Sequence, residues 1–325
     1  MSLRRIVLLV CCLTSTGFAA VQVSEEAVFH RMCDASAGIA LSTNIFVAAD
    51  DESNQLRTYS RAHPGVPVNQ LELGAFLQIG KGKPEIDAEG AAQVGDIVYW
   101  ITSHGRNRQG ELRPSRQRFF ATRISNKGEP RLEISGRPYA NLLRDLVADP
   151  QFEQFDLADA ASKAPKKKGA LNIEGLAARP DGTLLIAFRN PVPDKKALLI
   201  PLLNPAELVK PGGARAKFGP AIQLDLDGNG IRDMVQRDGK FYMIAGARDG
   251  GHDFQLYRWN GNAAPELLHE WKARSFNPEA ILSVPGRPNE FIILSDDGSL
   301  KQGGTECKDL PEAARRFRSV LLRIE

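Results

Sequence analysis

Short apolar runs recur along this sequence in five segments that share one layout. Each segment has a polar entry, a small apolar run, a turn and then a longer apolar run, which is the pattern of two adjacent β-strands. The longer runs begin at Ile45, Ile97, Leu184, Phe241 and Phe291. Turn signals such as the Asp-Gly pairs at 181–182 and 238–239 separate the two runs, and a further apolar strand follows each pair.

Units of several strands that recur about every fifty residues are typical of an all-β fold, a β-propeller, and fit a sandwich less well. We therefore expect five or six blades. The widest gap lies between the second and third units, where residues 139–147 have helical periodicity and a polar stretch ends in Lys-Lys-Lys-Gly at 166–169. This gap predicts a short helical insertion, with a degenerate extra blade as the alternative. The lysine run is interpreted as a solvated loop or else as a ligand patch, and a second helical pattern covers 310–317.

The N-terminus has the layout of an export signal. Arg4 and Arg5 precede an apolar stretch at 6–13, and small residues end the segment at Ala19 and Ala20. The apolar stretch is too short to span a bilayer. We therefore expect a signal peptide at 1–20 and a single propeller domain at 21–325, exported to the periplasm or the cell exterior with no membrane span. A lipid anchor on Cys11 or Cys12 is the alternative.

Composition narrows the choice of partner and compartment. Removal of the first twenty residues takes away two arginines and no acid, so the net charge falls from +3 to +1. A near-neutral chain argues against nucleic acid as the main partner. Cys33 and Cys307 are then the remaining cysteines. In an oxidising compartment they are expected to form a disulfide between the chain ends, with two separate thiols as the alternative.

The polar entries of the five segments predict an acidic ring. Aligning the segments places Glu89, Glu174, Asp233 and Glu279 at one position, with Ala37 in the first segment. Entry residues of successive blades face one another around the central channel of a propeller. Crowded carboxylates repel unless a cation or an arginine compensates them, so the ring predicts a divalent metal or a cationic cluster at the channel mouth. The alternative is that the acids accept backbone hydrogen bonds between blades.

Further charged residues end the longer apolar runs. They are found at 50–52, 103–106, 189–190, 248–249 and 296–297, and some of them should also approach a propeller face. Among them His104 is a candidate general acid or base beside Arg106 as an anion clamp, and Arg189 is a candidate for positioning an anionic substrate. A histidine that is merely part of the polar surface is the alternative.

A candidate calcium loop precedes the fourth segment. Asp225, Asp227 and Asn229 alternate as oxygen ligands before a glycine, which makes calcium the divalent metal that this pattern favours. However, no glutamate closes the loop at its twelfth position, and an ordinary turn explains the composition nearly as well.

Several motifs carry a resemblance to a known family. They are Phe46-Val-Ala-Ala-Asp-Asp-Glu-Ser-Asn-Gln-Leu-Arg, Tyr99-Trp-Ile-Thr-Ser-His-Gly-Arg-Asn, Asn172-Ile-Glu-Gly-Leu and Leu256-Tyr-Arg-Trp. With these motifs the chain resembles the bacterial family named domain of unknown function 3616, which implies a fold and no activity. The Asp-X-Glu-Gly entry is also similar to that of phytase-like or esterase-like propellers, which implies that Glu89 and Glu174 are channel residues.

Two functions follow from these patterns. The first is an exported module with an acidic central channel that binds a small anionic ligand or a protein partner. The alternative is a metal-dependent hydrolase of ester or phosphoester substrates. The sequence contains no Gly-X-Ser-X-Gly elbow, no His-Glu-X-X-His zinc motif and no phosphate loop, which argues against several common hydrolase classes.

Overall fold

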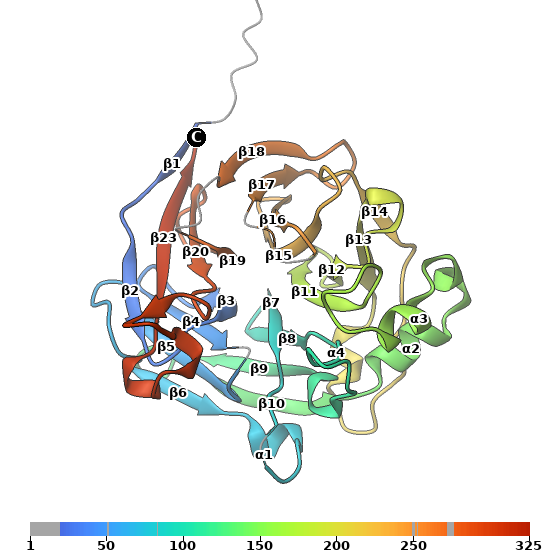
Figure 1. Cartoon of the computed structure of the whole chain (residues 1–325), viewed down its shortest axis with the longest axis horizontal. Helices are drawn as coiled ribbons and strands as arrows, with labels where there is room; N and C mark the ends of the chain where they lie inside the picture. The colour runs from blue at the N-terminus through green and yellow to red at the C-terminus, as the bar shows by residue number, and fades with distance from the viewer. Residues whose placement is uncertain (1–19, 51, 83, 249–250, 252, 272–275) are drawn as a thin grey trace, which may run out of the picture.

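Five antiparallel sheets are arranged in a ring around a central axis (Figure 1). The computed structural model describes residues 20–325 except 51, 83, 249–250, 252 and 272–275. The predicted export signal therefore lies almost wholly outside the described residues. The sheets confirm the predicted β-propeller and give it five blades.

The first four blades each consist of four consecutive strands, numbered from the axis outwards. The first contains β3 (Ala35–Ala40), β4 (Ile45–Asp50), β5 (Gln55–Ser60) and β6 (Asn69–Glu72). The second contains β7 (Ala88–Val94), β8 (Ile97–Thr102), β9 (Phe119–Ser125) and β10 (Arg131–Tyr139). The third contains β11 (Asn172–Ala178), β12 (Leu184–Asn190), β13 (Ala197–Leu202) and β14 (Ile222–Leu224). The fourth contains β15 (Gly230–Arg237), β16 (Lys240–Gly246), β17 (Phe254–Trp259) and β18 (Glu266–Trp271).

The fifth blade joins the two ends of the chain. Its inner strands are β19 (Pro278–Ser283), β20 (Glu290–Ser295) and β23 (Arg316–Ile324). The strands β1 (Val21–Val23) and β2 (Ala27–His30) both pair with β23, with Val21 opposite Ile324 (Figure 1). This pairing closes the ring without a covalent bond.

A disulfide also connects the chain ends. Cys33, just before β3, is bonded to Cys307, in the segment between β20 and β23, and the two Cα atoms are 5.9 Å apart. Both cysteines are buried. The predicted bridge is thus confirmed, and it ties the first blade to a loop of the fifth.

The apolar core is divided among the interfaces between blades. Five buried clusters each contain residues from two neighbouring sheets. Within β4, Phe46 and Ala48 belong to the interface with the fifth blade, whereas Val47 and Ala49 belong to the interface with the second. Successive side chains of a strand point to opposite faces. Because both faces are covered, the strands next to the axis read as continuous apolar runs.

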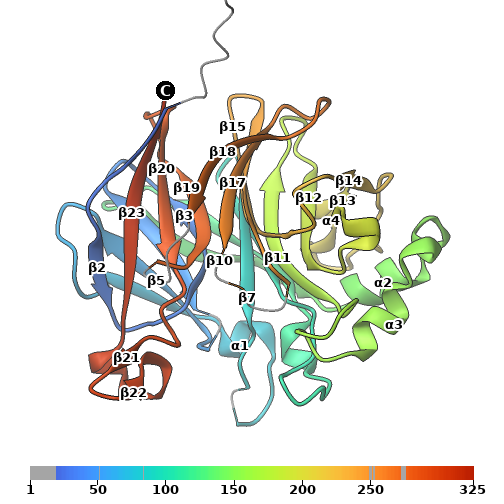
Figure 2. The same ribbon diagram turned by 45° about the horizontal axis from the view of Figure 1, so that its top comes forward.

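The predicted helical insertion lies between the second and third blades. It consists of α2 (Leu142–Ala148), a 3₁₀ segment (Pro150–Phe155) and α3 (Leu157–Ser162). Leu142, Leu146 and Phe152 are buried in the cluster shared by these two blades. Both views place the insertion at the periphery of the ring (Figures 1 and 2).

The remaining elements are short. They are α1 (Gly74–Leu77), α4 (Pro205–Leu208), the pair β21 (Lys301–Gln302) and β22 (Thr305–Glu306), and 3₁₀ turns at Pro114–Arg116, Pro193–Lys195, Cys307–Asp309 and Glu312–Ala314. The predicted helix at 310–317 is wrong, because β23 begins at Arg316 and buries the alternating Phe317, Ser319 and other side chains in strand fashion. Among the described residues, no helix is long and apolar enough to cross a membrane.

Candidate functional site

Each innermost strand carries a β-bulge near its start. The pairing with the second strand skips one residue in all five blades. The skipped residues are Ser36, Glu89, Glu174, Arg232 and Glu279. A bulge redirects a side chain away from the normal alternation of the strand. All five side chains are buried and line one cavity at the axis.

The structure corrects the alignment made from the sequence. The residues equivalent to the three glutamates are Ser36 and Arg232, and not Ala37 and Asp233. Asp233 lies one position further along, where its carboxylate accepts a hydrogen bond of 2.8 Å from the backbone N–H of Ile281 in the next blade. Burial raises the pKa of Asp233 well above its usual range. Asp233 therefore connects two blades and lies outside the lining of the cavity.

Close packing explains why a glycine follows two of the bulged glutamates. A Cβ atom on Gly90 would lie 2.9 Å from the backbone N of Leu176 in the third blade. A Cβ atom on Gly175 would lie 3.0 Å from the Cβ of Ala187 and 3.4 Å from the Cα of Asp233. The Glu-Gly pair thus combines a side chain aimed at the axis with a close approach of the next blade.

Arginines compensate two of the three bulged glutamates. Glu174 accepts hydrogen bonds through Oε1 from Arg189, at 2.7 Å, and from Asn172, at 2.6 Å. Arg232 lies between Glu174 and Glu279: its Nε is 3.5 Å from Glu174 Oε2, and its Nη2 donates to Glu279 Oε2. The same guanidinium lies 5.6 Å from the ring centroid of Phe254. At Glu174 and Glu279, these arginines therefore provide the cationic cluster that was predicted as the alternative to a metal.

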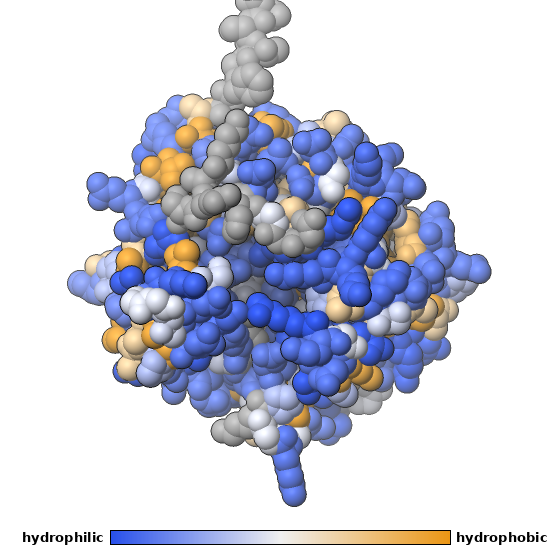
Figure 3. All heavy atoms as spheres, viewed as in Figure 1, coloured by the Kyte–Doolittle hydropathy of each residue, from blue (hydrophilic) through white to orange (hydrophobic). Residues whose placement is uncertain are grey.

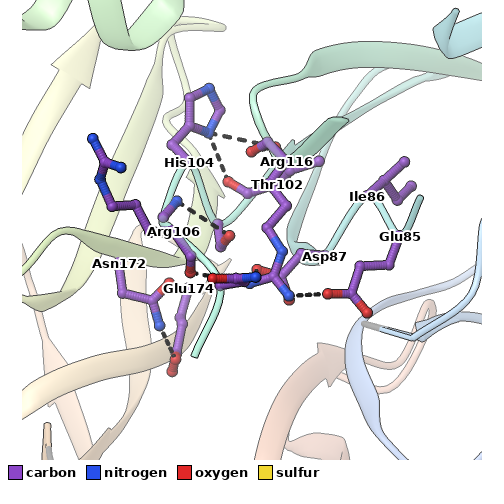
Figure 4. A network of polar contacts seen from close by, with 12 residues as sticks. Glu85, Ile86, Asp87, Thr102, His104, Arg106, Arg116, Asn172 and Glu174 are labelled. Carbon is purple, nitrogen blue, oxygen red and sulfur yellow. Dashed lines mark hydrogen bonds and ion pairs between the residues drawn. The ribbon is translucent and has the colours of Figure 1, made fainter. Parts of the chain in front are cut away.

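The third bulged glutamate has a different environment. In the described part of the chain, no hydrogen bond or ion pair reaches the Glu89 carboxylate. Burial, followed by the charges of Asp87 and Glu174, raises the pKa of Glu89 well above its usual range. Burial also raises the pKa of Asp87 to about 6, although Arg116 lies 2.9 Å from its carboxylate (Figure 4). This side of the cavity therefore holds two carboxyl groups whose pKa values are raised by burial.

Replacing Glu89 with glutamine is expected to stabilise the protein. A carboxyl group whose pKa is raised on folding favours the folded state at low pH, and this contribution is lost as the pH rises through the folded-state pKa. Glu89→Gln removes the ionisation, at about 1.4 kcal/mol for each unit of the pKa difference. We expect the melting temperature at pH 8 to rise by roughly 2 °C or more, with no change at pH 4.

The exposed Glu129 provides the matched control for this variant. Glu129→Gln should leave the melting temperature unchanged at both pH values, because an exposed carboxylate keeps its hydration in the folded state. A Glu89→Gln variant that is less stable at pH 8 would show that the ionised carboxylate has a compensating partner.

The cavity at the axis has a volume of about 1040 Å³. Among the described residues, seven carboxylate side chains and eight cationic side chains line it. The five bulged residues are part of this lining. Basic side chains from separate segments surround it, namely Arg108, Lys166, Lys167, Arg248 and Lys308. Burial, followed by the positive charges of Arg189 and Arg108, lowers the pKa of Lys166. The face seen in Figure 1 is mostly hydrophilic (Figure 3).

A smaller cavity of about 550 Å³ adjoins the axial one. Glu52, Asp87, Arg108, Arg116 and Lys308 line both. The smaller cavity extends away from the axis to Pro84, Gln109, Arg113 and Asp309. We call the larger one the axial cavity and the smaller one the side cavity.

Some of the charged residues that end the second strands line the same cavity. Adjacent strands are antiparallel, so the end of β8 at Thr102 pairs with the start of β7 at Ala88. Glu52, Arg189, Arg248 and Asp296 line the axial cavity. Asp50 instead lies 3.5 Å from Arg57, and Asp297 forms an ion pair of 2.7 Å with Arg318. Asp51 and Asp249 lie outside the described residues.

His104 and Arg106 do not reach the axial cavity with Arg189. The buried His104 ring donates from Nδ1 to the carbonyl oxygen of Thr102 at 2.7 Å, and it is directed away from Asp87 and Glu174 (Figure 4). Burial lowers the pKa of His104 to about 4. Arg106 donates to the carbonyl oxygens of Ala161 and Gly110, at 2.9 and 3.0 Å, and so ties its loop to the helical insertion.

The candidate calcium residues lie in the turn between β14 and β15. The backbone N–H of Asp227 donates to Asp225 Oδ1 at 3.2 Å, and Asn229 Nδ2 donates to Gln255 Oε1 at 3.1 Å. None of the three lines either cavity. In the part of the chain that the structure describes, no three His, Cys, Asp or Glu side chains are grouped so as to hold a metal ion. Calcium at Asp225, Asp227 and Asn229, and a divalent metal at the glutamates, stay predictions.

Sequence reasoning missed several residues of the cavity. Arg232 precedes an acid that resembles the glutamates, and Asn172 begins a strand that was recognised for Glu174. Aligning the small residues Gly90, Gly175 and Ala280 would have pointed to the preceding side chain in each blade. Lys166 and Lys167 carried no signal beyond their charge, because only the fold brings their loop to the axis.

Several solved structures have a similar fold. The glutaminyl cyclase of Myxococcus xanthus is 14% identical, with 94% of this chain and 98% of that chain covered and a TM-score of 0.47. The PQQ-bound aldose sugar dehydrogenase of Streptomyces coelicolor is 14% identical, with the same coverage and a TM-score of 0.44. The Cps50 (Swd1) β-propeller domain of Myceliophteria thermophila is 9% identical, covers 94% of this chain and 100% of that chain, and has a TM-score of 0.42.

The family comparison is more specific than these likenesses. No curated protein matches the sequence. A family model described as "Protein of unknown function (DUF3616)" matches residues 121–289, just over half of the 325 residues, from β9 to the turn before β20. The chain therefore belongs to the DUF3616 family.

Proposed function

We propose that this protein binds a small, multiply anionic ligand in the axial cavity. The observation that carries the proposal is the convergence of unpaired cations from three separate segments. Arg108, Lys166, Lys167 and Arg248 line the cavity, and none forms an ion pair within the described part of the chain. Unpaired positive charges in a concave site attract ligands of the opposite sign.

The charges of the bulged residues do not cancel those of the unpaired cations. Arg189 and Arg232 are paired with Glu174 and Glu279, so these four groups largely neutralise one another. Burial raises the pKa of Glu89 and so favours its neutral form. The positive charges of Arg108, Lys166, Lys167 and Arg248 are therefore available to an anionic ligand.

The loop lysines provide the test. Lys166 and Lys167 line the cavity, whereas the adjacent, exposed Lys168 does not. We expect titration calorimetry with citrate, pyrophosphate and galacturonate to detect binding of at least one of these anions by the wild type. Lys166→Glu/Lys167→Glu should weaken it at least tenfold, and Lys168→Glu should not. Added salt should weaken binding further. Equal affinities in the three proteins, or no anion bound, would refute the proposal.

Metal-dependent hydrolysis is the alternative function. The ion pairs of Glu174 and Glu279 with arginines favour binding over a metal-centred reaction. Glu89 is the group in the cavity best suited to donate a proton, since its pKa is raised by burial. Turnover of an ester or phosphoester that disappears in Glu89→Gln would favour hydrolysis over binding alone.

We also propose that the protein is exported. The residues from Arg4 to Ala20 have the order of a secretory signal, and disulfides such as Cys33–Cys307 persist mainly in oxidising compartments. N-terminal sequencing of the protein from periplasmic and secreted fractions tests this proposal. A chain that starts at Met1 in the cytosolic fraction would refute it.

A further inference from the structure

The axial and side cavities adjoin each other, and we treat them as two lobes of one site. Five charged residues line both cavities. The axial lobe measures about 1040 Å³ and the side lobe about 550 Å³. A compact anion such as citrate fills only part of this space, whereas a linear molecule of several units extends through both lobes.

The lining of the two lobes is mixed in chemistry. Both cationic side chains and carboxylates line the two lobes. Neutral hydrogen-bonding groups line them too: Asn172, Asn277 and Ser299 in the axial lobe, and Asn107, Gln109 and Ser115 in the side lobe. A ligand that carries only negative charge is repelled by the carboxylates. A ligand that carries only hydroxyl groups leaves the unpaired cations without a partner.

Acidic sugars carry groups that pair with both the carboxylates and the cations of this lining. Their hydroxyl groups donate hydrogen bonds to carboxylates such as Glu52 and Glu89, while their carboxylates accept from lysine and arginine side chains. Polyphosphates have the anionic groups but no hydroxyl groups for the carboxylates. The mixed lining and the two-lobed shape together favour a chain of sugar acids.

From the adjoining cavities and their lining, we propose that the ligand is a linear oligosaccharide of uronic acid units. One end lies in the axial lobe above the bulged glutamates and Arg232, and the chain continues past Arg108 and Arg116 into the side lobe. Arg113 there contacts a distal unit. This proposal rests on the proposed anion-binding function and specifies its ligand.

A length series of galacturonate oligomers tests the proposal. Calorimetric titration of the full mature chain with the monomer, dimer and trimer should show affinity that rises at least tenfold from monomer to trimer. Arg113 lines only the side lobe, and its side chain is 46% exposed and pairs with Glu111 at 2.7 Å, so its replacement should not disturb folding. Arg113→Ser should weaken binding of the trimer at least fivefold and leave binding of the monomer unchanged.

Control ligands separate the possible failures. Maltotriose, a neutral trimer, should bind at least tenfold more weakly than the galacturonate trimer. A trimer that binds no better than the monomer, or an Arg113→Ser effect equal on both, overturns the extended ligand. Binding of tripolyphosphate but of no galacturonate overturns the sugar acid and leaves the anion-binding function intact. Binding of none of the anionic probes refutes both.

Discussion

Replacing Arg232 with methionine should lower the free energy of unfolding by about 3–5 kcal/mol at pH 7. The guanidinium group lies between the buried carboxylates of Glu174 and Glu279, and its own side chain is 7% exposed. Methionine keeps most of the volume but removes the charge, so two buried carboxylates lose their common partner. Urea unfolding of the variant and the wild type measures the difference.

The pH dependence of this difference is part of the prediction. Without Arg232, the buried carboxylate of Glu279 loses its ion pair, whereas Glu174 keeps Arg189. A buried carboxylate that has lost its partner destabilises the folded state when it is ionised, and protonation at low pH removes this cost. The difference between variant and wild type should therefore shrink as the pH is lowered from 7 to 4.

Arg258 gives a matched control with the same substitution. It forms an ion pair of 2.7 Å with Glu266, a residue whose side chain is 44% exposed. Such a solvent-accessible pair contributes about 0–1 kcal/mol, so Arg258→Met should have a small effect. If Arg232→Met and Arg258→Met cost the same, or if the cost of Arg232→Met is independent of pH, the guanidinium does not hold the glutamates together. Should Arg232→Met fail to fold, Arg232→Lys provides an intermediate case with one retained charge.

The recognisable part of the fold is the part buried on two sides. Strands such as β4, β8 and β12 read as apolar runs because each face packs against a neighbouring blade. The outermost strands were not recognised. In β6 all four residues are exposed or half-buried, so no apolar pattern marks the strand. The pairing of β1 and β2 with β23 was also missed, since it joins segments almost 300 residues apart.

The candidate site was predictable to the extent that the strand entries are alike. Glu89, Glu174 and Glu279 were placed together because each is an acid at the polar entry of its segment. The fourth blade breaks this rule, since Asp233 occupies the position of the small residue and Arg232 that of the glutamates. An alignment on charge sign therefore chose the wrong residue of the pair. The bulge that decides between them arises from the packing of whole blades, which no local pattern records.

His104 was predicted as a site residue, but the fold turns it away from the cavity. The sequence gives it a charged neighbourhood, with Arg106 two residues away. In the fold, a positive φ of 54° at His104 and the hydrogen bond to Thr102 turn the ring away from the axis. Backbone conformation at a single residue thus decides which chemistry reaches the cavity.

Loss of the Cys33–Cys307 disulfide should lower the free energy of unfolding by about 4 kcal/mol. The bridge spans a sequence separation of 274 residues, so it restricts nearly the whole unfolded chain. The pairing of β1 and β2 with β23 holds the chain ends together in the folded state in either case. The expected effect therefore arises mainly in the unfolded state, where that pairing is absent.

Urea unfolding of the wild type and of Cys33→Ser/Cys307→Ser measures this effect, with and without dithiothreitol. Reductant should shift the wild-type midpoint to that of the double variant and leave the double variant unchanged. Asp34 and Lys308, the neighbours of the two cysteines, line the axial cavity, so the disulfide also anchors one side of the cavity entrance. The double variant should therefore bind anions more weakly under conditions where it is fully folded. Equal midpoints would mean that the bridge does not restrict the unfolded chain enough to change stability, and equal affinities would mean that the fold positions Lys308 without the bridge.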